Sequence, residues 1–526
     1  MKRTITNLMA VLFTAFMANG QVTVSDNITE NTTWSSDNVY LLDGGIFVEE
    51  GAKLTIEAGT VIKGKPGTGS SASYLCVSRG AQIEAIGTKD KPIIFTSEDD
   101  DLEGSVLLQE NGKWGGLIIL GKGTHNNDDN NNEIEGVVPD GENGLYGGDV
   151  EDDNSGQLKY VSIRHAGIEL APDEEINGLS MGAVGAGTTI DYIEVLSNKD
   201  DGIEFWGGAP QVKHALVAYC GDDSYDFDEG YHGYGQYWFA IQADQAGGEC
   251  GEHDGGPSDN RYGKPYAHPI ISNATYIGRG SSKSILKMRE FFGGEYHNSV
   301  FANQEKGIRF DYVEGAGSVY SRLIDSGDVV IKNNVFGDNI GDGTEAGMFE
   351  VYINDDEANY SIPGDAESKA DAKFSEMNNS VESFSIDMAQ VVPSVDVSGA
   401  DFNGLPEWFD QVSYKGAFDP DVSSHWGQGW SKTFESLETS IVKNETVSVD
   451  VSIYPNPVVD NATVNFNNPN NDAYTFALYS LTGQQVKSRT VEGSQFSFDK
   501  GSLKSGIYIY VLTNGQVKES GKIRIK

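Results

Sequence analysis

The stretch IDYIEVLSNKDDGIEFWGGAPQVKHALVAYCGDDSYDF, residues 190–227, decides the fold because it contains the same pair of strands twice. Ile190 and Val212 begin matching strands 22 residues apart, and Ile203 and Tyr225 begin a second matching pair at the same interval. Side chains alternate between the two faces of a strand, so the apolar residues of successive repeats share one face. A unit this short buries its apolar face only by stacking on its neighbours. The repeat therefore predicts a parallel β-helix with one coil per repeat.

The alternation recurs on both sides of this stretch. Residues 51–60 (GAKLTIEAGT) and 80–88 (GAQIEAIGT) share a turn glycine, an alternating strand and a second turn. Residues 285–288 and 307–310 again place a charge between apolar neighbours. Period-2 alternation turns one set of side chains inward: Ile203, Phe205, Tyr225, Phe227, Leu286, Met288, Ile308 and Phe310. With 64 glycines among 526 residues and only 15 prolines, the composition also favours many short strands and tight turns.

Charge divides the chain into two unlike parts. Residues 451–526 contain eight Lys and Arg against five Asp and Glu, a net charge of +3, whereas residues 21–450 contain 27 against 74, or −47. The overall formal charge of −42 excludes a protein that wraps nucleic acid. The expected all-β organisation is a solenoid over 21–434 with insertions near 229–268 and 344–390, a linker over 435–450, and a small C-terminal β-sandwich over 451–526.

The first 20 residues have the features of a secretory signal peptide. Lys2 and Arg3 are followed by an apolar run over residues 8–18 and by small residues before Gln21. The run is too short to span a membrane, and we expect residues 1–20 to be removed on export. No later segment of the sequence approaches 18 apolar residues, so no membrane span is predicted.

The C-terminal module carries four motifs in order: YPNP at 454–457, LYSLTGQ at 478–484, LKSGIY at 503–508 and KIRIK at 522–526. With these motifs, it closely resembles the C-terminal sorting domain of bacterial type IX secretion substrates. The resemblance implies passage through the periplasm and an outer-membrane channel, with the type IX secretion machinery as partner. It also implies cleavage of residues 451–526, with release or attachment at the surface. The alternative is a carbohydrate-binding or fibronectin-like sandwich whose motifs are accidental.

The alternating repeats and the segment WGGLIIL at 114–120 together give the acidic module its own resemblance. It is similar to the right-handed parallel β-helix proteins of bacterial cell surfaces over residues 38–434. The motifs specify a fold and not an activity. We therefore expect a right-handed parallel β-helix that is secreted or displayed on the outer-membrane surface.

One outward position of the repeats carries a charge in every strand. Stacked coils lie about 4.8 Å apart, so equivalent side chains form a ladder. Its predicted members are Glu204, Asp226, Lys287 and Arg309. The first two are 22 residues apart, and so are the last two, but the gap between Asp226 and Lys287 requires a long excursion. A rival register places Glu290 in the ladder instead of Lys287.

On the floor of a groove, this ladder would suit an acidic sugar polymer. The four residues are the ligand-binding candidates, and Lys287 or Arg309 could abstract a proton as a catalytic base. The ladder's two acids, or Asp201 with Asp223, could also offer the two carboxylates that a glycoside hydrolase needs about 5 to 9.5 Å apart. The alternative is a solvated face with ion pairs between coils.

Acidic clusters at residues 149–154 and 222–229 have the oxygen density of calcium loops, although neither has the spacing of an EF-hand. The candidate metal ligands are Asp200, Asp201, Asp222, Asp223, Asp226 and Asp228. Calcium prefers oxygen ligands and is the metal that these side chains predict. The alternative is that acidic loops only keep a surface protein soluble.

Two further patterns concern structure. In an oxidising compartment Cys220 and Cys250 could form a disulfide, while Cys76 stays a buried thiol. Asparagines recur at equivalent positions of three coils, and stacked asparagines form a hydrogen-bonded ladder. These are Asn273, Asn298 and Asn333.

Two functions are open at this point. The first is an exported cell-surface or secreted β-helix protein that binds glycans, acidic or neutral, or another surface ligand. The second is a calcium-dependent polysaccharide lyase or glycoside hydrolase on the same scaffold. The polygalacturonase motifs Asn-Thr-Asp, Asp-Asp, Gly-His-Gly and Arg-Ile-Lys are not present in order, which disfavours the enzyme.

Overall fold

The computed structural model divides into two compact units, Met1–Glu435 and Ser436–Lys526, each with its own hydrophobic core. It describes residues 20–435 and 451–526, apart from 128–131, 172–173, 244–245, 258–259, 316, 355–358, 467, 469–472, 481–484, 492, 502 and 515–517. The predicted signal peptide lies outside the described residues except for Gly20, and the predicted linker lies outside them except for Glu435.

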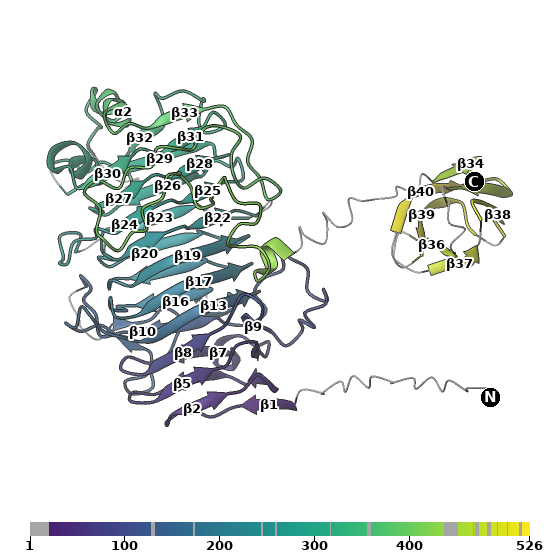
Figure 1. The fold of residues 1–526 in the computed structure, drawn as a ribbon, viewed down its shortest axis with the longest axis horizontal. Helices are drawn as coiled ribbons and strands as arrows, with labels where there is room; N and C mark the ends of the chain where they lie inside the picture. The colour runs from purple at the N-terminus through teal and green to yellow at the C-terminus, as the bar shows by residue number, and fades with distance from the viewer. Residues whose placement is uncertain are drawn as a thin grey trace, which may run out of the picture. The chain divides into compact units, whose positions relative to one another are not determined.

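The first unit is a stack of coils in which each strand pairs in parallel with the equivalent strand of the next coil (Figure 1). This is the predicted right-handed parallel β-helix. One wall is a 10-stranded sheet, here called the ladder sheet. It consists of β4 (Gly45–Val48), β7 (Tyr74–Val77), β10 (Leu117–Leu120), β16 (Leu179–Gly182), β18 (Ile203–Trp206), β20 (Tyr225–Asp228), β23 (Gly251–Asp254), β26 (Ser284–Arg289), β29 (Lys306–Asp311) and β32 (Phe349–Tyr352).

The rest of the coil comes from a 19-stranded sheet that bends at a corner. In the middle coils, the long strands β13 (Gly156–Arg164), β17 (Thr189–Leu196) and β19 (Gln211–Ala218) run through this corner at Tyr160, Tyr192 and His214, where φ is positive. Shorter strands take their place in the other coils: β1 (Gly20–Val24), β2 (Thr32–Trp34), β3 (Asn38–Leu42), β5 (Lys53–Ile56), β6 (Val61–Gly64), β8 (Gln82–Ile86), β9 (Ile93–Ser97), β21 (Tyr234–Gln236), β22 (Phe239–Ile241), β24 (Ile270–Ser272), β25 (Thr275–Ile277), β27 (Gly294–His297), β28 (Val300–Ala302), β30 (Val329–Lys332), β31 (Val335–Gly337) and β33 (Ser380–Glu382).

The inward side chains fill the interior of the coils. All eight residues predicted to face inward are fully buried. Phe205 and Phe227 lie on the adjacent strands β18 and β20 with their ring centroids 5.4 Å apart, and His253 stacks on Phe227 at 4.0 Å. Burying one such side chain stabilises a fold by about 1.5 to 3 kcal/mol, so the aromatic stack holds successive coils together.

The segment near 229–268 differs from the expected insertion because it supplies a coil of its own. β21 and β22 continue the 19-stranded sheet, and β23 continues the ladder sheet between β20 and β26. Gly251 and His253 occupy the inward positions of β23, opposite Tyr225 and Phe227. Neither residue is an apolar side chain, and the alternation of this strand is therefore hidden in the sequence.

The segment near 344–390 combines coil strands with a cap. It contains β32, β33 and the helix α2 (Ala366–Glu376), whose Phe374 packs on Phe336 and Phe349 at 5.2 and 5.3 Å between ring centroids. The helix therefore extends the core of the coils. The remaining short elements of the first unit are η1 (Gly69–Ser71), β11 (Asn132–Glu133), β12 (Leu145–Tyr146), β14 (Glu169–Ala171), β15 (Glu174–Glu175), α1 (Val319–Ser321) and η2 (Arg322–Ser326).

A strap, residues 398–435, runs back along the bent corner. Its backbone oxygens accept hydrogen bonds of 2.8 to 3.0 Å from corner side chains: Gly399 from Asn333, Asp401 from Asn298, Asp410 from Gln236 and Tyr414 from Asn273. Asn333 also donates to Asn298 Oδ1 at 2.8 Å, which confirms one step of the predicted asparagine ladder. The other step runs through Ser272, whose hydroxyl accepts from Asn298 at 3.2 Å and donates to Asn273 Oδ1 at 3.0 Å. At the end of the strap, the N–H groups of Lys432 and Thr433 donate to the buried Glu194 carboxylate at 3.0 and 2.8 Å.

All three cysteines are free and buried. The disulfide considered for Cys220 and Cys250 is therefore not formed. Burial raises the pKa of the Cys220 thiol to about 12, which keeps that thiol protonated. Cys76 is a buried thiol, as predicted, and it packs with Ile118 in a small apolar cluster on the outer face of the ladder sheet.

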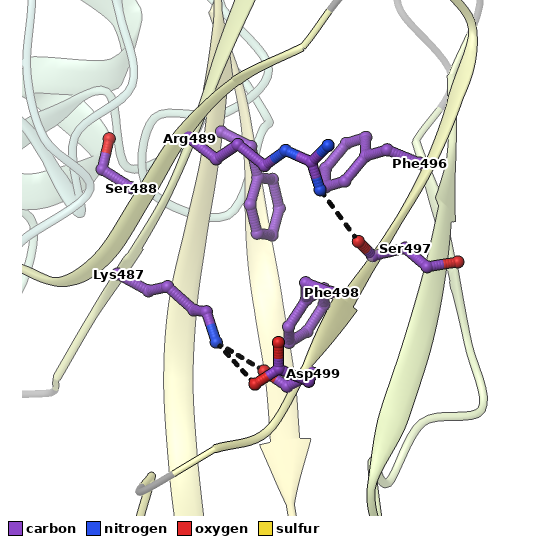
Figure 2. A pocket seen from close by; sticks show the side chains of 8 residues that line it. Lys487, Ser488, Arg489, Phe496, Ser497, Phe498 and Asp499 are labelled. Carbon is purple, nitrogen blue, oxygen red and sulfur yellow. Dashed lines mark hydrogen bonds and ion pairs between the residues drawn. The ribbon is translucent and has the colours of Figure 1, made fainter.

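The second unit is the predicted small β-sandwich. Its three-stranded sheet consists of β34 (Ser452–Tyr454), β35 (Asn461–Asn465) and β38 (Gln495–Asp499), and its four-stranded sheet of β36 (Tyr474–Tyr479), β37 (Gln485–Val491), β39 (Gly506–Thr513) and β40 (Lys518–Ile525). Figure 2 shows a pocket lined by residues of β36, β37 and β38. Its volume is ≈ 210 Å³. There Lys487 donates to Asp499 O at 2.5 Å and Arg489 donates to Ser497 O at 3.2 Å. These bonds join the two sheets at their edge strands.

Candidate functional site

The outward face of the ladder sheet carries the predicted charges in one column. Parallel pairing places Glu204 opposite Asp226, and Lys287 opposite Arg309. Glu252 of β23 lies between these pairs, opposite both Asp226 and Lys287. Glu350 of β32 lies opposite Arg309. The column therefore contains the four predicted residues and two that the sequence did not reveal.

The rival register, which replaces Lys287 by Glu290, is wrong. Glu290 follows the last residue of β26, and its backbone N–H donates to Asp311 Oδ2 at 3.0 Å. Its buried carboxylate lies 2.9 Å from Arg261 Nη2. This side chain therefore supports a neighbouring loop and does not belong to the column.

Both cations of the column are held by carboxylates of neighbouring coils. Lys287 Nζ lies 2.8 Å from Glu252 Oε1, and Arg309 Nε lies 3.2 Å from Glu350 Oε1. The side chains of Lys287 and Arg309 are 18% and 17% exposed. These contacts are the ion pairs between coils that the structural alternative expects.

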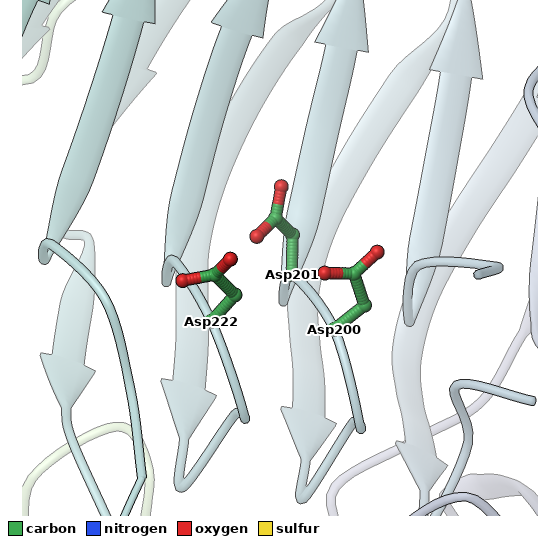
Figure 3. A group of neighbouring side chains, drawn as sticks. All are labelled: Asp200, Asp201 and Asp222. Atoms are coloured by element: carbon green, nitrogen blue, oxygen red, sulfur yellow. The ribbon is translucent and has the colours of Figure 1, made fainter. Parts of the chain in front are cut away.

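Acidic side chains from three consecutive coils meet at the start of β18, β20 and β23. Carboxylate oxygens lie within 4.8 Å of one another in three groups: Asp200 with Asp201 and Asp222, Asp201 with Glu204 and Asp226, and Asp223 with Glu249 and Glu252. Figure 3 shows the first group, whose side chains come from adjacent coils. We name these eight residues the acidic cluster. Three carboxylates at this distance are positioned to bind a metal ion.

Burial makes the charges of the acidic cluster costly. It raises the pKa of Asp201, Glu204, Asp223 and Asp226 well above the ordinary carboxyl range, and neighbouring carboxylates raise the pKa of each further. Burial also raises the pKa of Asp222, where nearby Lys283 acts in the opposite direction. Without a cation, the ionised cluster therefore destabilises the folded state.

The cluster receives some hydrogen bonds from the protein. Asp201 Oδ1 accepts from the backbone N–H of Asp223 at 2.8 Å, and Asn177 donates to Glu204. Within the described part of the chain, Asp226 Oδ1 is buried and has no hydrogen-bond partner. A buried carboxylate oxygen of this kind is costly unless a cation or donor reaches it, so the residues present fit a metal ion.

Asp228 and the predicted acidic segment 149–154 lie outside the acidic cluster. Asp228 is at the far end of β20, where burial, followed by neighbouring Glu229, raises its pKa to about 7. In the cluster at 149–154, Glu151 lies 3.0 Å from His232 Nε2 and Asp153 accepts from the backbone of Lys122 at 3.0 Å. Neither element contributes to the three metal-binding groups formed by the described residues.

The Glu204 side chain is less exposed than a residue on the floor of an open groove would be. It is only 6% exposed. The connection between β10 and β13 folds over the outer face of the ladder sheet, where Ile134, Val137 and Tyr146 pack on Trp206 and its apolar neighbours. Glu204 therefore belongs to the outward face but is buried there, so it does not form the floor of an open groove.

Comparison with known protein families identifies the two domains of the chain. Residues 452–526 match the secretion system C-terminal sorting domain, which confirms the type IX sorting domain. The protein is thus a secreted β-helix protein whose tail directs it to the type IX machinery and to secretion or cell-surface display. Residues 26–352 match the pectate-lyase-like β-helix domain, and the chain belongs to this family.

No curated protein matches the chain. A solved structure to which it is similar is the enzymatically active domain of tailspike protein 2 of bacteriophage CBA120. The identity is 10%, the alignment covers 92% of this chain and 72% of the other, and the TM-score is 0.22, which is too low to support a functional argument. Across the described residues, no helix combines the length and apolar character needed to cross a membrane.

Proposed function

We propose that the protein binds an acidic polysaccharide at the cell surface through a calcium-loaded acidic cluster. The observation that carries the proposal is the convergence of eight carboxylates from three coils, with the buried Asp226 Oδ1 lacking a partner in the described chain. Calcium accepts six to eight oxygen ligands, and uronate carboxylates could complete its shell. Membership in the pectate-lyase-like family supports a glycan as the ligand. Of the predicted calcium ligands, all but Asp228 belong to this cluster.

Binding is favoured over the alternative of a calcium-dependent lyase or a hydrolase. Lys287 is bound by Glu252 and Arg309 by Glu350, so neither candidate base is free of a carboxylate partner. The hydrolase is disfavoured because the polygalacturonase motifs are not present in order.

Calcium is expected to raise the melting temperature and to reverse its pH dependence. In EDTA, the raised carboxyl pKa values mean that the folded state binds more protons than the unfolded chain. The free energy of unfolding should then fall as the pH rises above about 4, the ordinary carboxyl value. A ligand at 100 times its Kd stabilises the native state by about 2.7 kcal/mol. Melting curves at pH 5 and pH 7.5, in EDTA and in millimolar calcium, measure both effects.

A pair of variants controls this measurement. Asp201→Asn with Asp226→Asn should remove the calcium-dependent shift, whereas Asp26→Asn with Asp37→Asn, which neutralises two exposed acids, should keep it. Identical melting curves in EDTA and calcium would exclude a structural calcium ion.

The cations of the column are expected to bind the carboxylates of the polymer in addition to those of Glu252 and Glu350, which they already contact. Replacing Lys287 and Arg309 by alanine should weaken binding to polygalacturonate by about 10-fold or more, because hydrogen bonds to charged groups contribute about 1.5 to 3 kcal/mol each. Affinity measurements in calcium test this. Lys89→Ala with Lys91→Ala removes two exposed cations and should leave the affinity unchanged. Accumulation of unsaturated uronate product, lost in Lys287→Ala, would instead establish a lyase.

A further inference from the structure

An aromatic platform forms where the loop that follows β23 meets the end of β26. Tyr262 is 52% exposed and Tyr266 is 39% exposed. Both rings pack against Phe291 nearly edge-on, with centroids 5.2 and 5.5 Å away. Adjacent exposed aromatic rings are unfavourable in water and commonly mark a binding surface. We use "platform" for these three residues.

The rings of the platform are held in place by contacts with the buried Arg322 side chain and with Gly317. Arg322, which is buried, donates from Nη1 to Phe291 O at 2.8 Å. Its guanidinium lies 4.9 Å from the centre of the Phe291 ring and 5.5 Å from that of Tyr266. Tyr262 Oη lies so close to Gly317 that a Cβ there would approach it to 2.0 Å. The rings are thus held in position before a ligand arrives, which reduces the entropic cost of binding.

The platform also offers positive charge on an otherwise strongly acidic unit. Lys264 is exposed, and its Nζ lies 5.4 Å from the centre of the Tyr266 ring. Arg261 on the same loop lies 2.9 Å from Glu290 Oε2. These cations favour an anionic ligand over a neutral one.

The platform adjoins the charged face of the ladder sheet. Phe291 follows two residues after Arg289, the last residue of β26. Arg289 contacts Glu252 of the acidic cluster and Asp254, each at 2.5 Å. A polymer bound at the acidic cluster therefore has a second surface within reach, beyond the end of the same strands.

We propose that the platform is a second subsite for the acidic polysaccharide, in which the half-exposed ring of Tyr262 stacks on a sugar ring and Lys264 binds a sugar carboxylate. The inference rests on the proposed function and extends it. A protein partner fits less well, because stable protein interfaces bury about 800 Å² on each side and the platform presents only a few side chains.

Affinity for polygalacturonate, measured on the full chain in calcium, tests the subsite. Tyr262→Ala with Tyr266→Ala should weaken binding about 5-fold or more, because both aromatic contacts with the polymer are lost. Lys264→Ala should weaken binding to polygalacturonate but not to its fully methyl-esterified, neutral form. Tyr454→Ala is the matched control, because Tyr454 is 51% exposed and lies in the other unit. Equal melting temperatures would show that the variants are folded.

The outcomes separate this inference from the proposed function. Unchanged binding in the double tyrosine variant, together with loss of binding in EDTA, overturns the platform alone. Loss of binding in the double tyrosine variant with no effect of EDTA supports the platform and overturns the calcium site. If Lys264→Ala loses affinity equally for the acidic and the neutral polymer, the proposed contact between Lys264 and a sugar carboxylate is overturned. Wild-type protein that binds neither polymer overturns both proposals.

Discussion

Replacing Phe227 with alanine is expected to lower the free energy of unfolding of the β-helix by about 3 to 5 kcal/mol. Phe227 is fully buried, and its ring centroid lies 4.0 Å from that of His253, 4.9 Å from that of Tyr231 and 5.4 Å from that of Phe205. Removing the ring leaves a cavity between coils that neighbouring aromatic rings cannot fill by small movements.

Chemical denaturation followed by circular dichroism measures this loss. Leu107→Ala is the control because Leu107 is 68% exposed, and its replacement should change the free energy of unfolding by less than about 0.5 kcal/mol. A loss below about 1 kcal/mol for Phe227→Ala would contradict the inward assignment.

The fold could be predicted because each coil repeats one local rule. Ile203 and Tyr225 are 22 residues apart, and the structure pairs them directly. Once alternation fixes which side chains point inward, a slip by one residue would expose the whole apolar set, so the register follows from the pattern. The same reasoning placed Lys287 opposite Arg309.

The rule fails where an inward position is not apolar. In β23 the inward residues are Gly251 and His253, and the buried His253 is accommodated because its Nε2 lies 2.7 Å from Tyr296 Oη. Burial lowers the pKa of His253 to about 3, so this ring is neutral in the core. The charged residue between them, Glu252, was missed for this reason. The signal in the sequence was a charged residue, Glu252, between two residues, Gly251 and His253, that could both face inward.

The acidic cluster was partly predictable for the same reason as the fold. Asp200 and Asp222, and likewise Asp201 and Asp223, are 22 residues apart and therefore lie on adjacent coils. Glu249 belongs to the missed coil and could not be placed. Glu204 is buried and accepts a hydrogen bond from Asn177, 27 residues away in sequence, and a repeat pattern contains no information about such a contact.

Deleting residues 451–526 is expected to abolish delivery of the β-helix to the surface and to leave it in the periplasm. The sorting domain has its own core, including Val464, Phe476 and Leu512, and is a compact unit separate from the β-helix. The deletion should therefore remove the export signal without unfolding the other unit. Protease treatment of intact cells and cell fractionation measure the result, which should approach complete loss of surface-exposed protein.

Two controls separate loss of the signal from loss of the fold. The truncated β-helix should keep the melting temperature of its counterpart in the full chain, because its core contains no residue of the second unit. Residues 451–526 fused to a folded periplasmic reporter should carry that reporter to the surface, whereas a fusion with Val464→Asp should not, since Val464 is fully buried and an unpaired charge there would unfold the sandwich. Surface display of the truncated chain at the normal level would show that export does not depend on the folded tail.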